Sequence, residues 1–127
     1  MYKGKIASPK PKGKPMKTAQ RDLEVSKIIA EDVLGWEWNA GGWYSNNEFQ
    51  TDYFDPMNDP KQLDMVMNVG LDIELTEANG GWEATAPNTD KETTGISDDK
   101  LFVSAPIKAE AICFVLCMMA GDNPANW

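Results

Sequence analysis

"LDIELTEANGGWEATA", residues 71–86, contains two strand-like segments on either side of an Asn-Gly pair. Leu71, Ile73 and Leu75 alternate with polar or acidic residues, which is the pattern of a strand with one buried face. Asn79-Gly80 is a favoured tight turn of a two-stranded hairpin, and the return strand starts at Trp82. The stretch therefore predicts an antiparallel hairpin and, with it, an antiparallel sheet.

Three segments outside this hairpin have the 3.6-residue period of helices. The first covers residues 18–35, and the third covers residues 106–121 with Pro106 near its start. The second opens with Asp59 as its N-cap and Pro60 in its first turn. The positions that these patterns place inside are Val25, Ile28, Ile29 and Val33 in the first helix, Leu63, Val66 and Met67 in the second, and Ile107, Ala111, Ile112, Val115, Leu116 and Met119 in the third.

An aromatic hairpin over residues 36–45, turning at Gly41-Gly42, and a strand over residues 101–105 complete the predicted elements. Residues 46–58 and 87–100 are predicted to be polar loops. The resulting order is α-β-β-α-β-β-β-α, which indicates an α+β fold with an antiparallel sheet covered by helices. A glycine-rich phosphate loop of the GxxxxGK or GxGxxG type is absent from the sequence.

Charge divides the 127 residues into unequal parts. Residues 1–17 hold six lysines and no acid, and are predicted to be a disordered tail. Residues 18–121 form a single predicted domain, followed by a C-terminal tail at 122–127. The chain beyond residue 17 has 6 basic and 20 acidic side chains, a formal charge of −14. Such a surface disfavours nucleic-acid backbones and favours a basic partner, although acidic surfaces also serve solubility alone.

The composition disfavours catalysis. The sequence has no histidine, which removes the usual general base near neutral pH and the commonest metal ligand. Cys113 and Cys117 lie four apart in an apolar helix and are predicted to be core residues. The acidic stretch 52–64 does not have the spacing of a calcium loop. We therefore expect a non-enzyme without cofactor or metal. The sequence has no apolar run long enough to span a membrane, and its N-terminus lacks the apolar region of a signal peptide. The protein is therefore expected in the cytoplasm.

Aromatic residues gather in "VLGWEWNAGGWYS", residues 33–45. Trp36 and Trp38 lie two apart and are expected on one face of a strand, and Trp43 enters from the return strand. We expect at least two of the three to close the core beneath the first helix. An exposed member would be an anchor for a partner, because tryptophan is enriched at interface centres.

A second candidate is an acidic and aromatic surface that follows this hairpin. Its carboxylates would imitate a nucleic-acid backbone, and its rings would imitate stacking bases. The residues predicted to bind a partner are Asp52, Tyr53, Phe54, Asp55 and Asp59, together with Trp43 and Tyr44.

Several of these segments together resemble the phage ABA-sandwich domain family over roughly residues 20–120. They are "VLGWEW", the aromatic hairpin, "FDPMNDPKQL", "WEATA" and the closing "APIKAEAIC". The resemblance implies a layered helix/sheet/helix fold and a phage-encoded accessory protein. The family has no shared catalytic residues to carry over. The lysine-rich N-terminal segment and the loop at residues 88–99 depart from its pattern.

The leading hypothesis is a phage-encoded, non-catalytic binding protein that inhibits a host immune protein of the CRISPR or restriction class, in the cytoplasm of the infected bacterium. Acidic mimicry of nucleic acid is one way in which it would act. The expected partner is a host protein with a basic surface; direct contact of the body with nucleic acid, or with a membrane, is not expected. Two alternatives stay open: a protein that sequesters a nucleotide immune signal, and a structural or assembly accessory protein of the phage. The oligomeric state is left open.

Overall fold

The structure is a computed structural model that describes residues 18–124. The predicted tail at residues 1–17 lies outside the described residues, as do residues 125–127 of the predicted C-terminal tail. The elements confirm the α+β class. In chain order they are α1 (Thr18–Ile28), the π-helix η1 (Ile29–Val33), β1 (Glu37–Asn39), β2 (Gly42–Ser45), β3 (Glu48–Thr51), α2 (Pro60–Met67), β4 (Glu74–Ala78), β5 (Gly81–Pro87), α3 (Lys91–Thr94), β6 (Lys100–Ala105) and α4 (Lys108–Met119).

The strands form two antiparallel sheets instead of the one predicted. Sheet A has the strand order β1-β2-β3, and sheet B has the order β4-β5-β6. A second difference lies in residues 46–58, which were expected to be a polar loop but contain β3, paired with β2. The other predicted loop, residues 87–100, contains the short helix α3.

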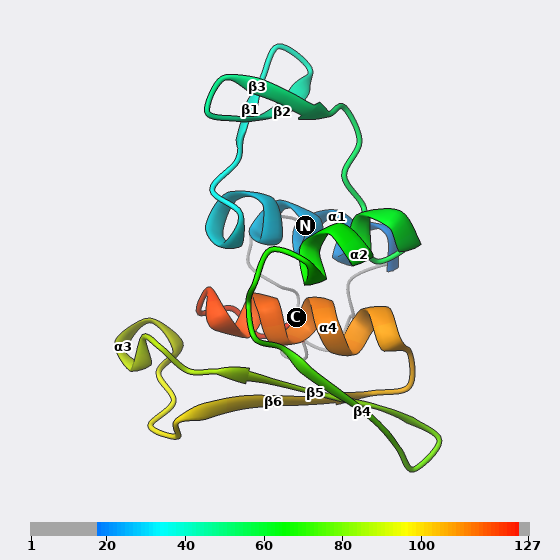
Figure 1. Cartoon of the computed structure of the whole chain (residues 1–127), viewed down its shortest axis with the longest axis vertical. Coiled ribbons are helices and arrows are strands. Elements are labelled where there is room, and N and C mark those ends of the chain that lie inside the picture. Colours follow the sequence, from blue (N-terminus) through cyan, green and yellow to red (C-terminus); the bar gives the residue numbers. More distant parts are fainter. Residues whose placement is uncertain (1–17, 125–127) are drawn as a thin grey trace, which may run out of the picture.

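The elements are stacked in layers (Figure 1). Sheet A lies above α1 and α2, α4 lies beneath these helices, and sheet B is the bottom layer. α4 packs against β5 and β6 on one side and against α1 and η1 on the other. Since α1, α2 and α4 all lie on one side of sheet B, the helix/sheet/helix layering implied by the resemblance is not confirmed within residues 18–124. The first helix packs on α4 and not directly on the sheet.

The helix α4 is buried on both sides. Toward α1 and α2 it contributes Ile112, Cys113, Leu116 and Cys117 to one hydrophobic cluster. Toward sheet B it contributes Ala111 and Val115 to a second cluster, with Leu101, Val103 and Ala105 of β6. A helix enclosed in this way has to be apolar around most of its circumference, as "KAEAICFVLCMM" is. The predicted burial of both cysteines is confirmed.

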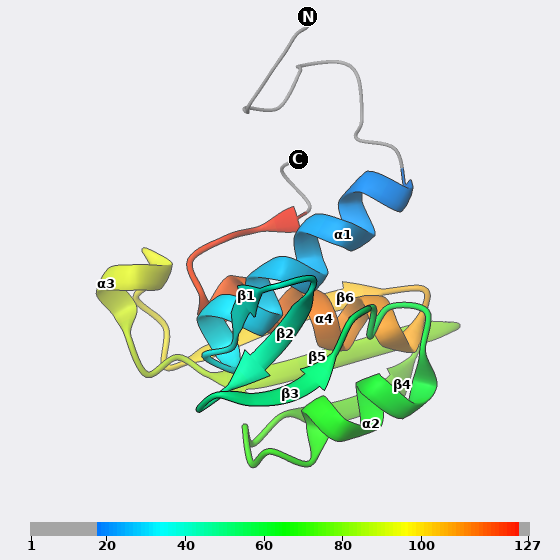
Figure 2. The same ribbon diagram turned by 90° about the horizontal axis from the view of Figure 1, so that it is seen from above.

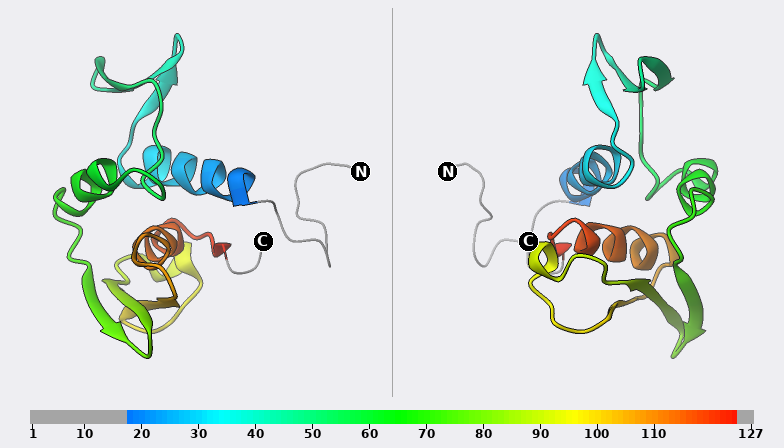
Figure 3. Two further views of the ribbon diagram at one scale, coloured as in Figure 1. Left: turned by 90° about the vertical axis from the view of Figure 1, so that its right-hand side faces the viewer. Right: turned by 60° about the vertical axis from the view of Figure 1, so that its left-hand side comes forward.

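Sheet A projects from the helices of the body (Figure 3), and the π-helix leads the chain toward it. The Leu34 amide donates to the Ile29 carbonyl at 2.9 Å, a five-residue spacing that widens the last turn. Gly35 then takes a left-handed conformation, with φ of 73°, and reverses the chain. Trp36 is buried against the helices immediately before β1 begins.

Three two-residue turns close the hairpins. Their central residues all have positive φ, as type I′ turns require: Ala40-Gly41, Asn46-Asn47 and Asn79-Gly80. The predicted turn at Asn79-Gly80 is confirmed. The turn of the aromatic hairpin lies one residue earlier than predicted, because Asn39 pairs with Gly42.

Replacing Ile112 by aspartate should unfold the protein. Ile112 is fully buried, and an uncompensated charge between α4 and the helices above it costs about 5 kcal/mol, comparable with the whole stability of a typical domain. Urea unfolding followed by circular dichroism measures the effect.

The matched control is the same substitution at Ile107. This residue was predicted to be buried, but it is the N-cap of α4, 56% exposed and without a side-chain cap. Ile107→Asp should therefore stabilise the helix by about 0.5–1 kcal/mol. Equal losses of stability in the two variants would contradict the burial assigned to α4.

The two thiols should be protected until the protein unfolds. Burial raises the pKa of Cys113 and raises that of Cys117 to about 12, from an ordinary value of 9.0. At pH 8 both should react with a thiol reagent far more slowly in the native protein than in urea. Because only the unfolded thiols ionise between pH 9 and about 12, their contribution to stability persists below pH 9 and is lost as the pH rises through that range. A Cys113→Ala/Cys117→Ala variant should lose less stability than the parent as the pH rises through this range. An unchanged dependence of the free energy of unfolding on pH would contradict this prediction.

Candidate functional site

A groove of about 470 Å³ lies between α1 and sheet A. We call it the aromatic groove. One wall is the outer face of α1, and the other is formed by sheet A and the segment that follows β3. Seen from above, α1 runs alongside sheet A (Figure 2). The lining residues are Leu23, Glu24, Ser26, Lys27 and Glu31 of the helical wall, and Trp38, Trp43, Asp52, Tyr53 and Phe54 of the opposite wall.

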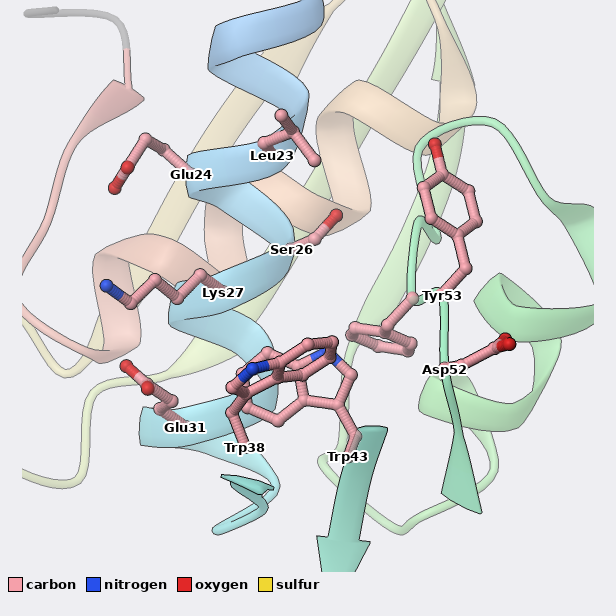
Figure 4. A pocket seen from close by; sticks show the side chains of 10 residues that line it. Leu23, Glu24, Ser26, Lys27, Glu31, Trp38, Trp43, Asp52 and Tyr53 are labelled. Atoms are coloured by element: carbon pink, nitrogen blue, oxygen red, sulfur yellow. The ribbon is translucent and has the colours of Figure 1, made fainter. Parts of the chain in front are cut away.

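The accessible part of this groove is largely apolar. Trp38 and Trp43 make an edge-to-face contact with ring centroids 5.3 Å apart. Three side chains remain widely exposed: Trp38 at 53%, Tyr53 at 61% and Leu23 at 57%. Figure 4 shows the two indoles together at one end of the groove, Leu23 on α1, and Tyr53 across from it. Large apolar side chains that gather at a concave surface indicate an interaction site, whereas scattered ones do not.

The three tryptophans therefore have different roles. Trp36 is buried and packs on Phe54 with ring centroids 4.9 Å apart. Trp43 is half-buried against the same core, which confirms that two of the three close it. The expectation that Trp36 and Trp38 lie on one face of a strand was wrong, since Trp36 precedes β1 and is buried while Trp38 lies within the strand and is exposed.

The segment that carries Tyr53 is fixed by α2. The Gln62 side chain makes two hydrogen bonds to it: its amide nitrogen donates to the Tyr53 carbonyl at 2.8 Å, and its amide oxygen accepts from the Asp55 backbone N–H at 2.6 Å. Thr51 binds the same segment: its hydroxyl accepts from the Tyr53 N–H and donates to the Tyr53 carbonyl. The exposed ring thus projects from a rigid backbone, which lowers the entropic cost of binding.

Asp55 belongs to a hydrogen-bond network that contains two buried carboxylates. Nδ2 of Asn58 donates to Oδ2 of Asp22 on α1 and to Oδ2 of Asp55, both at 2.9 Å. Arg21 pairs with Asp22 and also with Glu110 of α4, each at 3.1 Å. The other oxygen of Asp55, Oδ1, is buried without a hydrogen-bond partner in the part of the chain that the structure describes. Asn58 and Arg21 therefore tie α1 to the groove segment and to α4.

Three of the predicted binding residues have structural roles. Phe54 and Asp55 are buried, because one fills the core and the other joins the Asn58 network. Asp59 caps α2 by accepting from the Lys61 and Gln62 backbone N–H groups, which confirms its predicted structural role.

The remaining predicted residues divide between two places. Asp52, Tyr53 and Trp43 line the aromatic groove. Tyr44 instead contacts Phe49 on β3, with ring centroids 5.6 Å apart, and is not a lining residue. Of the three acidic residues predicted to bind a partner in residues 52–59, Asp52 is therefore the one that lines the groove.

The helical wall was missed by the sequence reasoning. Leu23 and Lys27 of α1 and Glu31 of η1 lie four residues apart, on the side of these helices opposite Val25 and Ile29, which are buried. A leucine on an otherwise polar face is a weak signal, because single exposed apolar residues are common. With Glu24 and Asp52, this rim has three carboxylates and one lysine.

The groove has little that could drive covalent chemistry. Ser26 is buried, and its hydroxyl donates to the Asp22 carbonyl at 2.8 Å. A hydrogen bond to the Asp55 carboxylate raises the pKa of Tyr53, which keeps the phenol protonated. Among residues 18–124, no group of three or more cysteine or acidic side chains is arranged to hold a metal ion.

No family model matches the chain, and no curated protein matches its sequence. Its fold is similar to that of a phage protein from Bacillus cereus ATCC 14579, known from a 2.0 Å crystal structure, with a TM-score of 0.56 and 15% sequence identity. The match covers 91% of this chain and 98% of the other. This likeness shows a shared fold.

None of the helices within the described range is both long enough and apolar enough to span a bilayer.

Replacing Asn58 by alanine should destabilise the protein by about 1–3 kcal/mol, because it removes the donor shared by two buried carboxylates. The matched control is Asn68→Ala at the exposed end of α2, which should change stability by less than about 0.5 kcal/mol. Thermal unfolding of both variants measures the difference. Equal stability of the two would show that the network contributes nothing.

Proposed function

We propose that the protein is a non-catalytic binding protein that captures a protein partner in the aromatic groove. The observation that carries this proposal is the joint exposure of Trp38, Tyr53 and Leu23 around one groove. The segment that carries Tyr53 is held by hydrogen bonds from Gln62, and Asn58 joins it to α1. Tryptophan and tyrosine dominate the energetics of protein interfaces when they are held in place before binding.

The charge of the rim supports a basic partner. Glu24, Glu31 and Asp52 surround the apolar surface, with Lys27 as the one cation of the lining. The chain beyond residue 17 has a formal charge of −14, which would steer a positively charged protein toward it. The favoured ligand therefore presents an apolar side chain flanked by lysine or arginine.

The same charges weigh against the nucleotide alternative. A protein that sequesters a nucleotide signal needs cations or backbone N–H groups for the phosphates, yet three carboxylates and one lysine line this groove. Aromatic stacking alone does not compensate for that repulsion.

The biological setting of the proposal is a phage. It is supported by the resemblance of the segments quoted above and by the similar fold of the Bacillus cereus phage protein. In that setting the partner would be a host protein, and inhibition of an immune effector of the CRISPR or restriction class is the role we propose. The surface involved would be the aromatic groove, not a stretch of acids that imitates nucleic acid.

Capture from host lysate with groove variants tests the proposal. Trp38→Ala and Tyr53→Ala should each weaken recovery of a specific partner, with a loss of affinity of about 30-fold, as for interface hot spots of about 2 kcal/mol. Phe102→Ala is the matched control, because Phe102 is another exposed aromatic residue but lies on β6 of sheet B. Partner binding that survives both groove substitutions, or that is lost in the control, would contradict the assignment.

Reversed charges test the rim in the same assay. The double variant Glu24→Lys/Asp52→Lys should slow association about tenfold or more and reduce its dependence on salt. Glu92→Lys/Asp98→Lys, equal in charge but near α3 on the far side of the body, should change association much less. Binding that is insensitive to salt would favour an uncharged partner instead.

A further inference from the structure

The aromatic groove favours a particular kind of peptide. Its exposed rings, Trp38 and Tyr53, offer flat surfaces for proline rings and lysine stems, and its rim supplies carboxylates for ammonium groups. Aromatic-lined grooves bind extended proline-containing segments well, since such segments are already ordered before binding. Lysine beside tryptophan adds a cation–π attraction.

The chain itself contains a segment of this composition. Residues 1–17, "MYKGKIASPKPKGKPMK", combine six lysines with Pro9, Pro11 and Pro15 and no acidic residue. Two larger apolar side chains, Tyr2 and Ile6, lie toward its start. Its charge is thus opposite to that of the groove rim and of the remaining chain.

The attachment point lies beside the groove. Lys17 is followed directly by Thr18, the first residue of α1, and the groove wall begins at Leu23. From Thr18 to Glu31 the helix rises about 20 Å. Seventeen residues in an extended conformation span up to about 50 Å. The segment is therefore long enough to turn back and lie along the whole wall.

From this composition, charge and attachment we infer that residues 1–17 bind in the aromatic groove of their own chain. The prolines lie against Trp38, Trp43 and Tyr53, and the lysines pair with the rim carboxylates. The tether gives the segment an effective concentration on the order of 1 mM at the groove, so that weak contacts suffice.

The consequence is competition with the partner, and this part of the inference rests on the proposed function. A partner that uses the aromatic groove has to displace the segment first, and its apparent affinity falls by the fraction of molecules in which the groove is free. Weakly basic proteins are then excluded, while a ligand with a better apolar anchor still enters.

Paramagnetic labelling of the full chain tests the contact without any partner. A Ser8→Cys variant takes a nitroxide selectively, because Cys113 and Cys117 are buried. At low salt the label should broaden the indole N–H signals of Trp38 and Trp43 but not that of Trp82, which lies on sheet B. In 1 M salt the signals should recover, since the Debye length falls to about 3 Å. Tenfold dilution should change nothing if the contact lies within one chain.

The outcomes separate the hypotheses. Equal signals for Trp38, Trp43 and Trp82 at low salt would overturn the inference, and broadening that disappears on dilution would assign the segment to a second copy. Neither result depends on whether Trp38→Ala weakens partner binding, so the proposed function is tested separately. Where the groove is occupied nine-tenths of the time, replacing all six lysines by glutamine should tighten partner binding about tenfold. Unchanged partner affinity, despite observed broadening, would show that the segment does not compete.

Discussion

The enclosure of α4 between two layers determines the rest of this structure. One side of the helix completes the core with α1 and α2, and the other covers sheet B. Each layer thus buries a large part of its apolar surface against α4. Arg21 adds a polar tie along the same contact, because it pairs with Asp22 on its own helix and with Glu110 on α4. The position of α1, and with it one wall of the aromatic groove, thus follows from the packing around α4.

Features encoded by neighbouring residues were predictable from the sequence. The Asp59 cap, the turn at Asn79-Gly80 and the apolar positions Val25 and Ile112 each depend on a short pattern with a direct physical cause. β3 was missed because "EFQT" is short and exposed, without the alternation that marks a buried face. The π-helix over Ile29–Val33 likewise has no local signature in the sequence.

The candidate site was only half predictable, for the same reason. Trp43, Asp52 and Tyr53 lie in the stretch that the sequence singled out, but their neighbours across the groove come from α1. Phe54 is adjacent to Tyr53 in sequence and faces the opposite way, because the hydrogen bonds of Gln62 fix the backbone between them. A run of acids and aromatics does not reveal which members face inward; only the partners of each side chain decide that.

The position of α4 after both sheets in chain order has a consequence for biosynthesis. A ribosome completes both sheets and the first two helices before it makes this helix. Until Met119 has emerged, the growing chain has two apolar layers facing water and nothing to place between them. The two layers therefore reach their final packing only once α4 has been made, and until then their exposed apolar surfaces favour aggregation. A fragment that ends before α4 would lack the helix on which α1 packs, and with it the support of one wall of the aromatic groove.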